Sequence, residues 1–144
     1  MLRLNEDLII RIRAHGEQTY PHECCGALLG RDEETEREIL DLLPLENRHG
    51  ESPRNRFTIS AGDFRRAEQV ASERGLNLLG WYHSHPDHPA LPSEFDRAHA
   101  WPTYSYVIVS VEQRKSGQVT SWRLESDRVR FTPERIEIAA HIRV

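Results

Sequence analysis

Residues 80–86 read Gly-Trp-Tyr-His-Ser-His-Pro, and Ser93 and Asp96 extend them to the pattern His-x-His-x7-Ser-x2-Asp. Side chains of a β-strand alternate between its two faces, so His83 and His85 point the same way. A carboxylate from a helix just downstream can reach the same point. The spacing therefore predicts a strand, a loop and a helix that bring two imidazoles and one carboxylate together.

These three side chains have the composition of a catalytic zinc site. In such sites three protein ligands hold the ion through nitrogen or oxygen, and water takes the open fourth position. Structural zinc is usually closed by four ligands rich in cysteine. We therefore expect His83, His85 and Asp96 to bind one zinc ion per chain.

The same residues also have a purely structural interpretation. Ser93 and Asp96 fit the Ser-x-x-Asp box that caps the N-terminus of a helix. A lone histidine near a strand end is more often a satisfied polar side chain than a ligand. Cap and metal site are compatible, because a helix can present Asp96 from its first turn while Ser93 stands at its entrance. The full spacing favours the metal site.

A hydrolytic zinc site also needs a general base that is not itself a ligand. Glu23 is the best candidate, because it stands near the start of an apolar run over residues 24–30, after a break at Pro21. Spacing alone is equally compatible with an exposed carboxylate at the start of a strand.

The remaining hydrophobic pattern alternates helices and strands without repeats. It predicts a helix from the cap Asn5 to about residue 18, one over residues 63–74 that Gly75 ends, and one from Ser93. Strands are predicted over residues 25–31, 37–45, 56–59, 76–83, 105–111, 119–124 and 129–131. Helices before, within and after a mixed sheet imply an α-β-α sandwich.

Two polar loops separate these elements. The loop over residues 46–56 is either plain solvated chain or a flap over the substrate, since loops on a rigid scaffold commonly carry recognition. The loop over residues 86–92 holds three prolines, which stiffen the path between the predicted ligands.

The cysteines are neighbours, Cys24 and Cys25, and a disulfide between them would be strained. We expect two free thiols on opposite faces of a strand. A cysteine metal site would need Cys-x-x-Cys, and the zinc deaminases use His-x-Glu with Pro-Cys-x-x-Cys; the sequence contains neither. His22, His88 and His99 are predicted not to be ligands.

The chain length of 144 residues fits one domain over residues 1–144. A net charge of −4 and a pI near 6.1 do not indicate the basic surface that is typical of nucleic-acid-binding proteins. The sequence has no apolar run long enough to span a bilayer, and charges within the first twenty residues argue against a signal peptide. We expect a cytoplasmic protein, with its oligomeric state left open.

The motifs together resemble a known family. A Glu before a Gly-containing apolar strand, followed by His-Ser-His-Pro and Ser-x-x-Asp, resembles the JAMM (MPN+) metalloproteases. The segment Pro-His-Glu-Cys-Cys-Gly at residues 21–26 is similar to their compact prokaryotic members, and the resemblance covers about residues 5–125. It implies that His83, His85 and Asp96 are the zinc ligands.

The resemblance also implies the remaining roles. Glu23 would take a proton from water and pass it to the leaving amine, and Ser93 would hydrogen-bond the oxyanion. The implied fold is an α-β-α sandwich with a mixed, curved, cytidine-deaminase-like sheet. The implied activity is zinc-dependent hydrolysis of the peptide or isopeptide bond after the C-terminal Gly-Gly of a ubiquitin-like or sulfur-carrier protein. A noncatalytic scaffold that binds the tail, and a zinc hydrolase of a small amide, are the alternatives; the complete ligand set argues against the scaffold.

Overall fold

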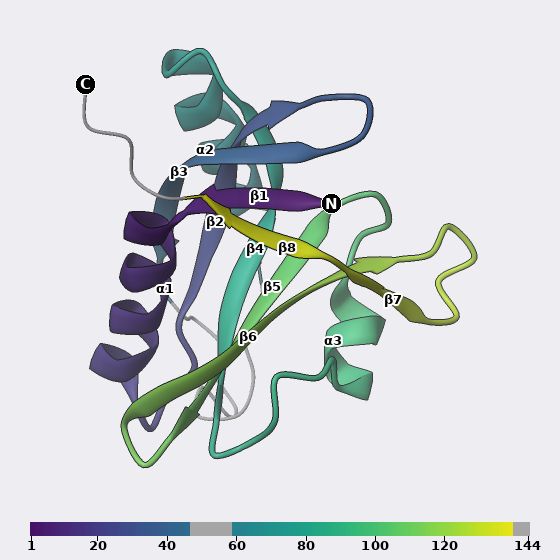
Figure 1. The fold of residues 1–144 in the computed structure, drawn as a ribbon. Helices are drawn as coiled ribbons and strands as arrows, with labels where there is room; N and C mark the ends of the chain where they lie inside the picture. The colour runs from purple at the N-terminus through teal and green to yellow at the C-terminus, as the bar shows by residue number, and fades with distance from the viewer. Residues whose placement is uncertain (47–58, 140–144) are drawn as a thin grey trace.

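The computed structural model describes residues 1–46 and 59–139 (Figure 1). The strands are β1 (Leu2–Asn5), β2 (Cys25–Asp32), β3 (Arg37–Leu45), β4 (Asn77–Pro86), β5 (Ser105–Glu112), β6 (Lys115–Leu124), β7 (Phe131–Glu134) and β8 (Ile136–Ala139). The helices are α1 (Glu6–Thr19), α2 (Ala61–Glu73) and α3 (Glu94–His99). The strands form one eight-stranded sheet in the order β7-β6-β5-β4-β2-β3-β1-β8. Because β4–β5, β1–β3 and β1–β8 are parallel and the other pairs antiparallel, the sheet is mixed, as predicted.

Alternation along the strands builds an apolar core on each face of this sheet. Under α1 the core includes Leu8, Ile12, Leu28, Tyr82 and Val109. On the face of α2 it includes Leu29, Ala67, Ala71, Trp81 and Tyr106. Sequence neighbours on one strand thus enter different cores, as the period of two requires. The result is the predicted α-β-α sandwich.

The sheet curves until its two ends meet. β7 and β8 lie at opposite ends of the strand order, yet only Arg135 separates them in sequence. The carbonyl of Arg135 accepts a hydrogen bond from the backbone N–H of Leu2 at 2.8 Å, beside the parallel pairing of β1 with β8. The curled sheet therefore has its two end strands joined by one residue.

The sequence prediction was incomplete at these ends. It missed β1 and β8, and it placed the last hairpin strand over residues 129–131 where β7 begins at Phe131. Val129 suggested a strand but lies 66% exposed in the turn before β7. The turn is fixed locally, because Arg128 adopts a φ of 62° and the Asp127 carboxylate accepts the N–H of Val129 at 2.9 Å.

The helix ends follow the expected capping chemistry. Asn5 caps α1 by accepting the N–H of Leu8 at 2.9 Å. α2 begins two residues earlier than predicted, because Ser60 and Asp63 form a reciprocal capping box before the apolar face starts. Gly75 follows α2 with a φ of 69°, a conformation that favours glycine.

Other expectations have mixed outcomes. The strands predicted over residues 25–31, 37–45, 76–83, 105–111 and 119–124 are confirmed as β2 to β6, with small extensions. Both cysteines are free and buried, Cys24 in the core under α1 and Cys25 in the other. The loop over residues 46–56 and the strand over residues 56–59 lie almost entirely outside the described residues. None of the described helices is long and apolar enough to cross a membrane.

Candidate metal centre

Strand pairing brings Glu23 to the face that carries the two histidines. Cys25 of β2 lies opposite His83 of β4, so the two share a face, and Glu23 two residues earlier falls on that face beside His85. Ser84 points to the other face, where its hydroxyl accepts the N–H of Cys24 at 2.8 Å. The N–H of Ser84 returns a bond to the Cys24 carbonyl at 3.2 Å, which holds the residues before β2 against β4.

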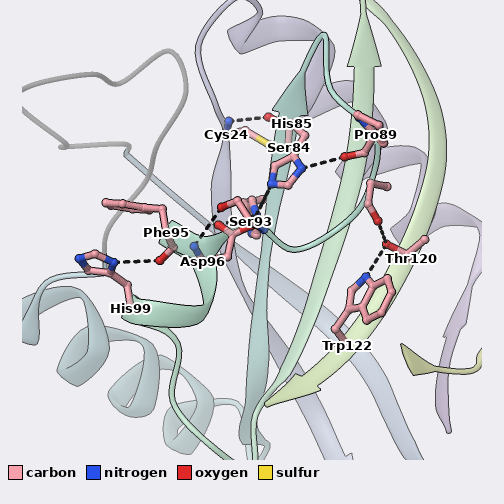
Figure 2. A network of polar contacts seen from close by, with 12 residues as sticks. Cys24, Ser84, His85, Pro89, Ser93, Phe95, Asp96, His99, Thr120 and Trp122 are labelled. Atoms are coloured by element: carbon pink, nitrogen blue, oxygen red, sulfur yellow. Dashed lines mark hydrogen bonds and ion pairs between the residues drawn. The ribbon is translucent and has the colours of Figure 1, made fainter. Parts of the chain in front are cut away.

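Helix α3 delivers the second carboxylate. The Ser93 hydroxyl accepts the N–H of Asp96 at 3.0 Å, and the Asp96 carboxylate accepts the N–H of Ser93 at 2.8 Å (Figure 2). The Ser-x-x-Asp segment is thus a genuine capping box. The same carboxylate faces the two imidazoles, so the cap positions Asp96 at the centre.

Four side chains converge at this point. The Nε2 atoms of His83 and His85 are 3.1 Å apart, and they lie 3.3 Å and 3.1 Å from the two oxygens of Asp96. Glu23 joins the two histidines in a group whose ligand atoms all lie within 4.8 Å of one another. All four residues are buried, from 1% exposed for His83 to 8% for Asp96.

These separations fit a tetrahedral ion. Zinc bonds of about 2.0–2.1 Å place neighbouring nitrogen and oxygen ligands about 3.3 Å apart. The donor set and its spacing therefore suit a divalent cation that prefers nitrogen and oxygen ligands.

The surroundings of the two histidines also suit a bound cation. Burial lowers the pKa of His83 and outweighs the pull of the Asp96 carboxylate, which favours the form of the imidazole that can bind a metal. The Nδ1 of His85 lies 2.9 Å from the carbonyl of Pro89, which can only accept a proton. An imidazole whose Nδ1–H is held in this way presents its Nε2 to a metal.

The pKa values of the two carboxyl groups, Asp96 and Glu23, are shifted in opposite directions. Burial by itself would raise the pKa of Asp96, but His83 and His85 outweigh it and hold this pKa well below its usual range. Burial and the negative charge of Asp96 raise the pKa of Glu23 to about 9. Asp96 is therefore ionised and Glu23 holds a proton at neutral pH when no cation is present.

The centre opens into a hollow of about 270 Å³, lined by Glu23, His85, His88, Pro89, Leu91 and Ser93. A second, apolar hollow touches His83 and Asp96 from the side of Phe95 and Trp101. Glu23 and Ser93 therefore line the same opening.

The histidines predicted not to be ligands do not belong to the group of Glu23, His83 and His85 found in the described residues. His22 stands in the turn before β2, His88 lines the hollow from its loop, and His99 stacks on Phe95 in α3 at 4.0 Å. The sequence did not predict that Ser84 holds the backbone of Cys24. Its only indication was that Ser84 lies between His83 and His85 and so faces the other side of the sheet.

Comparisons with known proteins place this geometry in context. Residues 5–125 match the protein family described as prokaryotic homologs of the JAB domain. A Thermus thermophilus protein named probable TtuB-protein conjugate cleaving protease is 34% identical over 112 residues, which are 78% of this chain and 72% of that protein. A Haloferax volcanii desampylase is 33% identical over 95 residues, 65% of this chain and 66% of the relative. A JAB1/MPN domain protein from Archaeoglobus fulgidus superposes with a TM-score of 0.60 at 15% identity, covering 96% of this chain and 97% of that one.

Proposed function

This chain belongs to the family of prokaryotic homologs of the JAB domain, and we propose that it is a zinc-dependent peptidase or isopeptidase. Its substrate bond would follow the C-terminal Gly-Gly of a ubiquitin-like or sulfur-carrier protein. The observation that carries the proposal is the buried convergence of His83, His85 and Asp96 at 3.1–3.3 Å with Glu23 alongside. Two relatives named for cleaving conjugates or desampylation support the substrate class.

His83, His85 and Asp96 would hold the ion. Glu23 also lies within reach of it, but Asp96 is the stronger candidate because its two oxygens each face an imidazole Nε2. A bound zinc would lower the pKa of water toward about 7 and polarise the scissile carbonyl. This assignment gives proton transfer, rather than metal binding, to Glu23.

Glu23 would carry the proton during hydrolysis. Its carboxyl lines the hollow beside His85 and Ser93, and burial together with Asp96 raises its pKa to about 9, which supports a role as proton carrier. A nearby cation would lower this pKa and let the carboxylate take a proton from water. The protonated acid could then deliver it to the leaving amine.

Ser93 would stabilise the oxyanion. Its Oγ already accepts the N–H of Asp96, so the hydroxyl hydrogen remains able to donate. Ser93 is exposed and lines the same hollow as Glu23, which places that donor where a substrate carbonyl can enter. The cap thereby fixes the position of the hydroxyl.

Ser93→Ala separates capping from catalysis. Loss of an oxyanion donor should lower kcat by about 10²–10³-fold. Loss of the cap should lower the free energy of unfolding by about 1 kcal/mol and leave turnover per folded molecule unchanged. Melting temperature and kcat measured on one sample decide between the roles, and an unchanged kcat would rule out the oxyanion assignment.

The substrate proposal is tested with carriers that end in Gly-Gly and carry one extra residue or a short peptide. Because the centre is buried, only a backbone without side chains can approach it closely, so changing the last glycine to valine should abolish cleavage. Short peptides without the carrier should be poor substrates, because they lack its remote binding surface. The measurement is mass spectrometry after incubation with wild type and Glu23→Gln. Equal cleavage of Gly-Gly and Gly-Val tails would refute the tail specificity and leave the zinc hydrolase standing.

A further inference from the structure

The Pro89 carbonyl, which accepts from His85 Nδ1, belongs to the loop after β4, and a hydrogen bond from β6 holds this loop in place. Its neighbour in sequence, the carbonyl of Ala90, accepts a hydrogen bond from the Thr120 hydroxyl at 2.6 Å. The indole Nε1–H of Trp122 donates to the same hydroxyl at 2.8 Å (Figure 2). An indole N–H can only donate, so the Thr120 hydroxyl accepts from Trp122 and turns its hydrogen to Ala90.

Sheet register explains how β6 reaches the metal centre. His83 of β4 pairs with Ile108 of β5, and Ile108 pairs with Thr120 of β6. Residues opposite one another in a sheet share a face, so Thr120 stands two strands away on the face of the ligands. Trp122 lies on that face as well, two residues along β6. The loop after β4 folds back over this face and meets Thr120.

The bond to Thr120 matters because Ala90 is fully buried, with 0% of its surface exposed. Its carbonyl is shielded from bulk water, and a buried carbonyl that loses its donor is costly. Directly before it, the carbonyl of Pro89 accepts both the Nδ1–H of His85 and the N–H of Leu91, at 2.9 Å and 2.8 Å. If the Ala90 carbonyl lost its bond to Thr120, the tight turn over residues 89–91 would be able to rotate. The Pro89 carbonyl would then move away from His85.

We propose that Thr120, held by Trp122, is a positioning residue for His85. It fixes the turn over residues 89–91 so that the Pro89 carbonyl stays at 2.9 Å from His85 Nδ1 and the ring keeps its Nε2 at the metal centre. Neither residue touches the ion or the substrate. The inference rests on the proposed metal centre, but the orientation of His85 exists without the ion.

The first test compares zinc affinity of Thr120→Val and Thr120→Ser. Valine keeps the shape and removes both hydrogen bonds, so zinc should bind about 10–100-fold more weakly in competition with a chromophoric chelator. Serine keeps the hydroxyl and should restore affinity to within a few-fold of wild type. The matched control is Thr132→Val, which removes a hydroxyl bonded to the Arg123 carbonyl elsewhere in the sheet and should leave zinc binding unchanged.

The second test needs no metal. In metal-free protein the backbone N–H of Leu91, which donates to the Pro89 carbonyl, should exchange with solvent faster in Thr120→Val than in wild type, because the turn over residues 89–91 is no longer fixed. Trp122→Phe removes only the donor to Thr120 and should raise the exchange rate less. A Thr120→Val protein with the wild-type exchange rate and wild-type zinc affinity would overturn the proposal. Failure of the wild type to bind zinc would instead refute the metal centre, while exchange at Leu91 still decides whether Thr120 fixes the turn.

Discussion

Glu23→Gln is expected to lower the rate of hydrolysis by at least about 10²-fold while zinc stays bound. Glutamine keeps the shape and the hydrogen-bonding capacity of Glu23 but cannot take up a proton. If Asp96 rather than Glu23 is the third ligand, the ion is held as before and substrate binding is nearly intact. The measurement combines kcat and KM with zinc content by elemental analysis.

The matched control is Glu94→Gln, the same change on the first turn of α3. Glu94 faces solvent with 77% of its side chain exposed and pairs with Arg97, so activity should be unchanged. Loss of zinc together with activity in Glu23→Gln would show that Glu23 is a ligand and would contradict its role as base. Full activity with zinc bound would show that another group moves the proton.

The same variant has a stability signature in metal-free protein. The pKa of Glu23 is raised from 4.5 to about 9, so the folded state retains a proton that the unfolded chain releases as pH rises. Stability of the wild type should therefore fall between about pH 5 and 9, and Glu23→Gln should lack this fall. Metal-free Glu23→Gln should melt at a higher temperature than wild type, by a margin that grows with pH over this range.

The ligand pattern was readable from sequence because it is local. His83, His85 and Asp96 lie within one strand, loop and helix, where the strand period and the capping box fix the directions of the side chains. Glu23 was only a candidate from sequence. Its burial to 3% exposure depends on the register of β2 with β4, which the pattern does not encode.

The parts missed depend on contacts between distant segments. β1 and β8 are four residues each, and their strand character comes from pairing Leu2 with Ile136 across the chain. The role of Thr120 needs the register of three strands at once. Val129 misled because β-branched residues favour strands, whereas the backbone of Arg128 and the Asp127 side chain impose a turn.

Loss of any one predicted ligand is expected to remove both zinc and activity. His83→Ala, His85→Ala or Asp96→Ala leaves two ligands, and such a remnant competes poorly with hydration of the ion. We expect about one zinc per chain in wild type and almost none in each variant by elemental analysis.

Thermal unfolding with added zinc gives an independent readout. A ligand that binds only the folded state at about 100 times its dissociation constant adds about 2.7 kcal/mol to the free energy of unfolding. Zinc should therefore raise the melting temperature of wild type and of the control His99→Ala, whose imidazole contacts Phe95 at the surface of α3. It should leave the melting temperature of His83→Ala unchanged.

Cys24→Ser/Cys25→Ser should keep zinc, because both thiols are buried in the two apolar cores and neither belongs to the metal-binding group found in the described residues. Zinc retained by the triple ligand variant, or lost from the cysteine variant, would show that the ion is bound elsewhere in the chain.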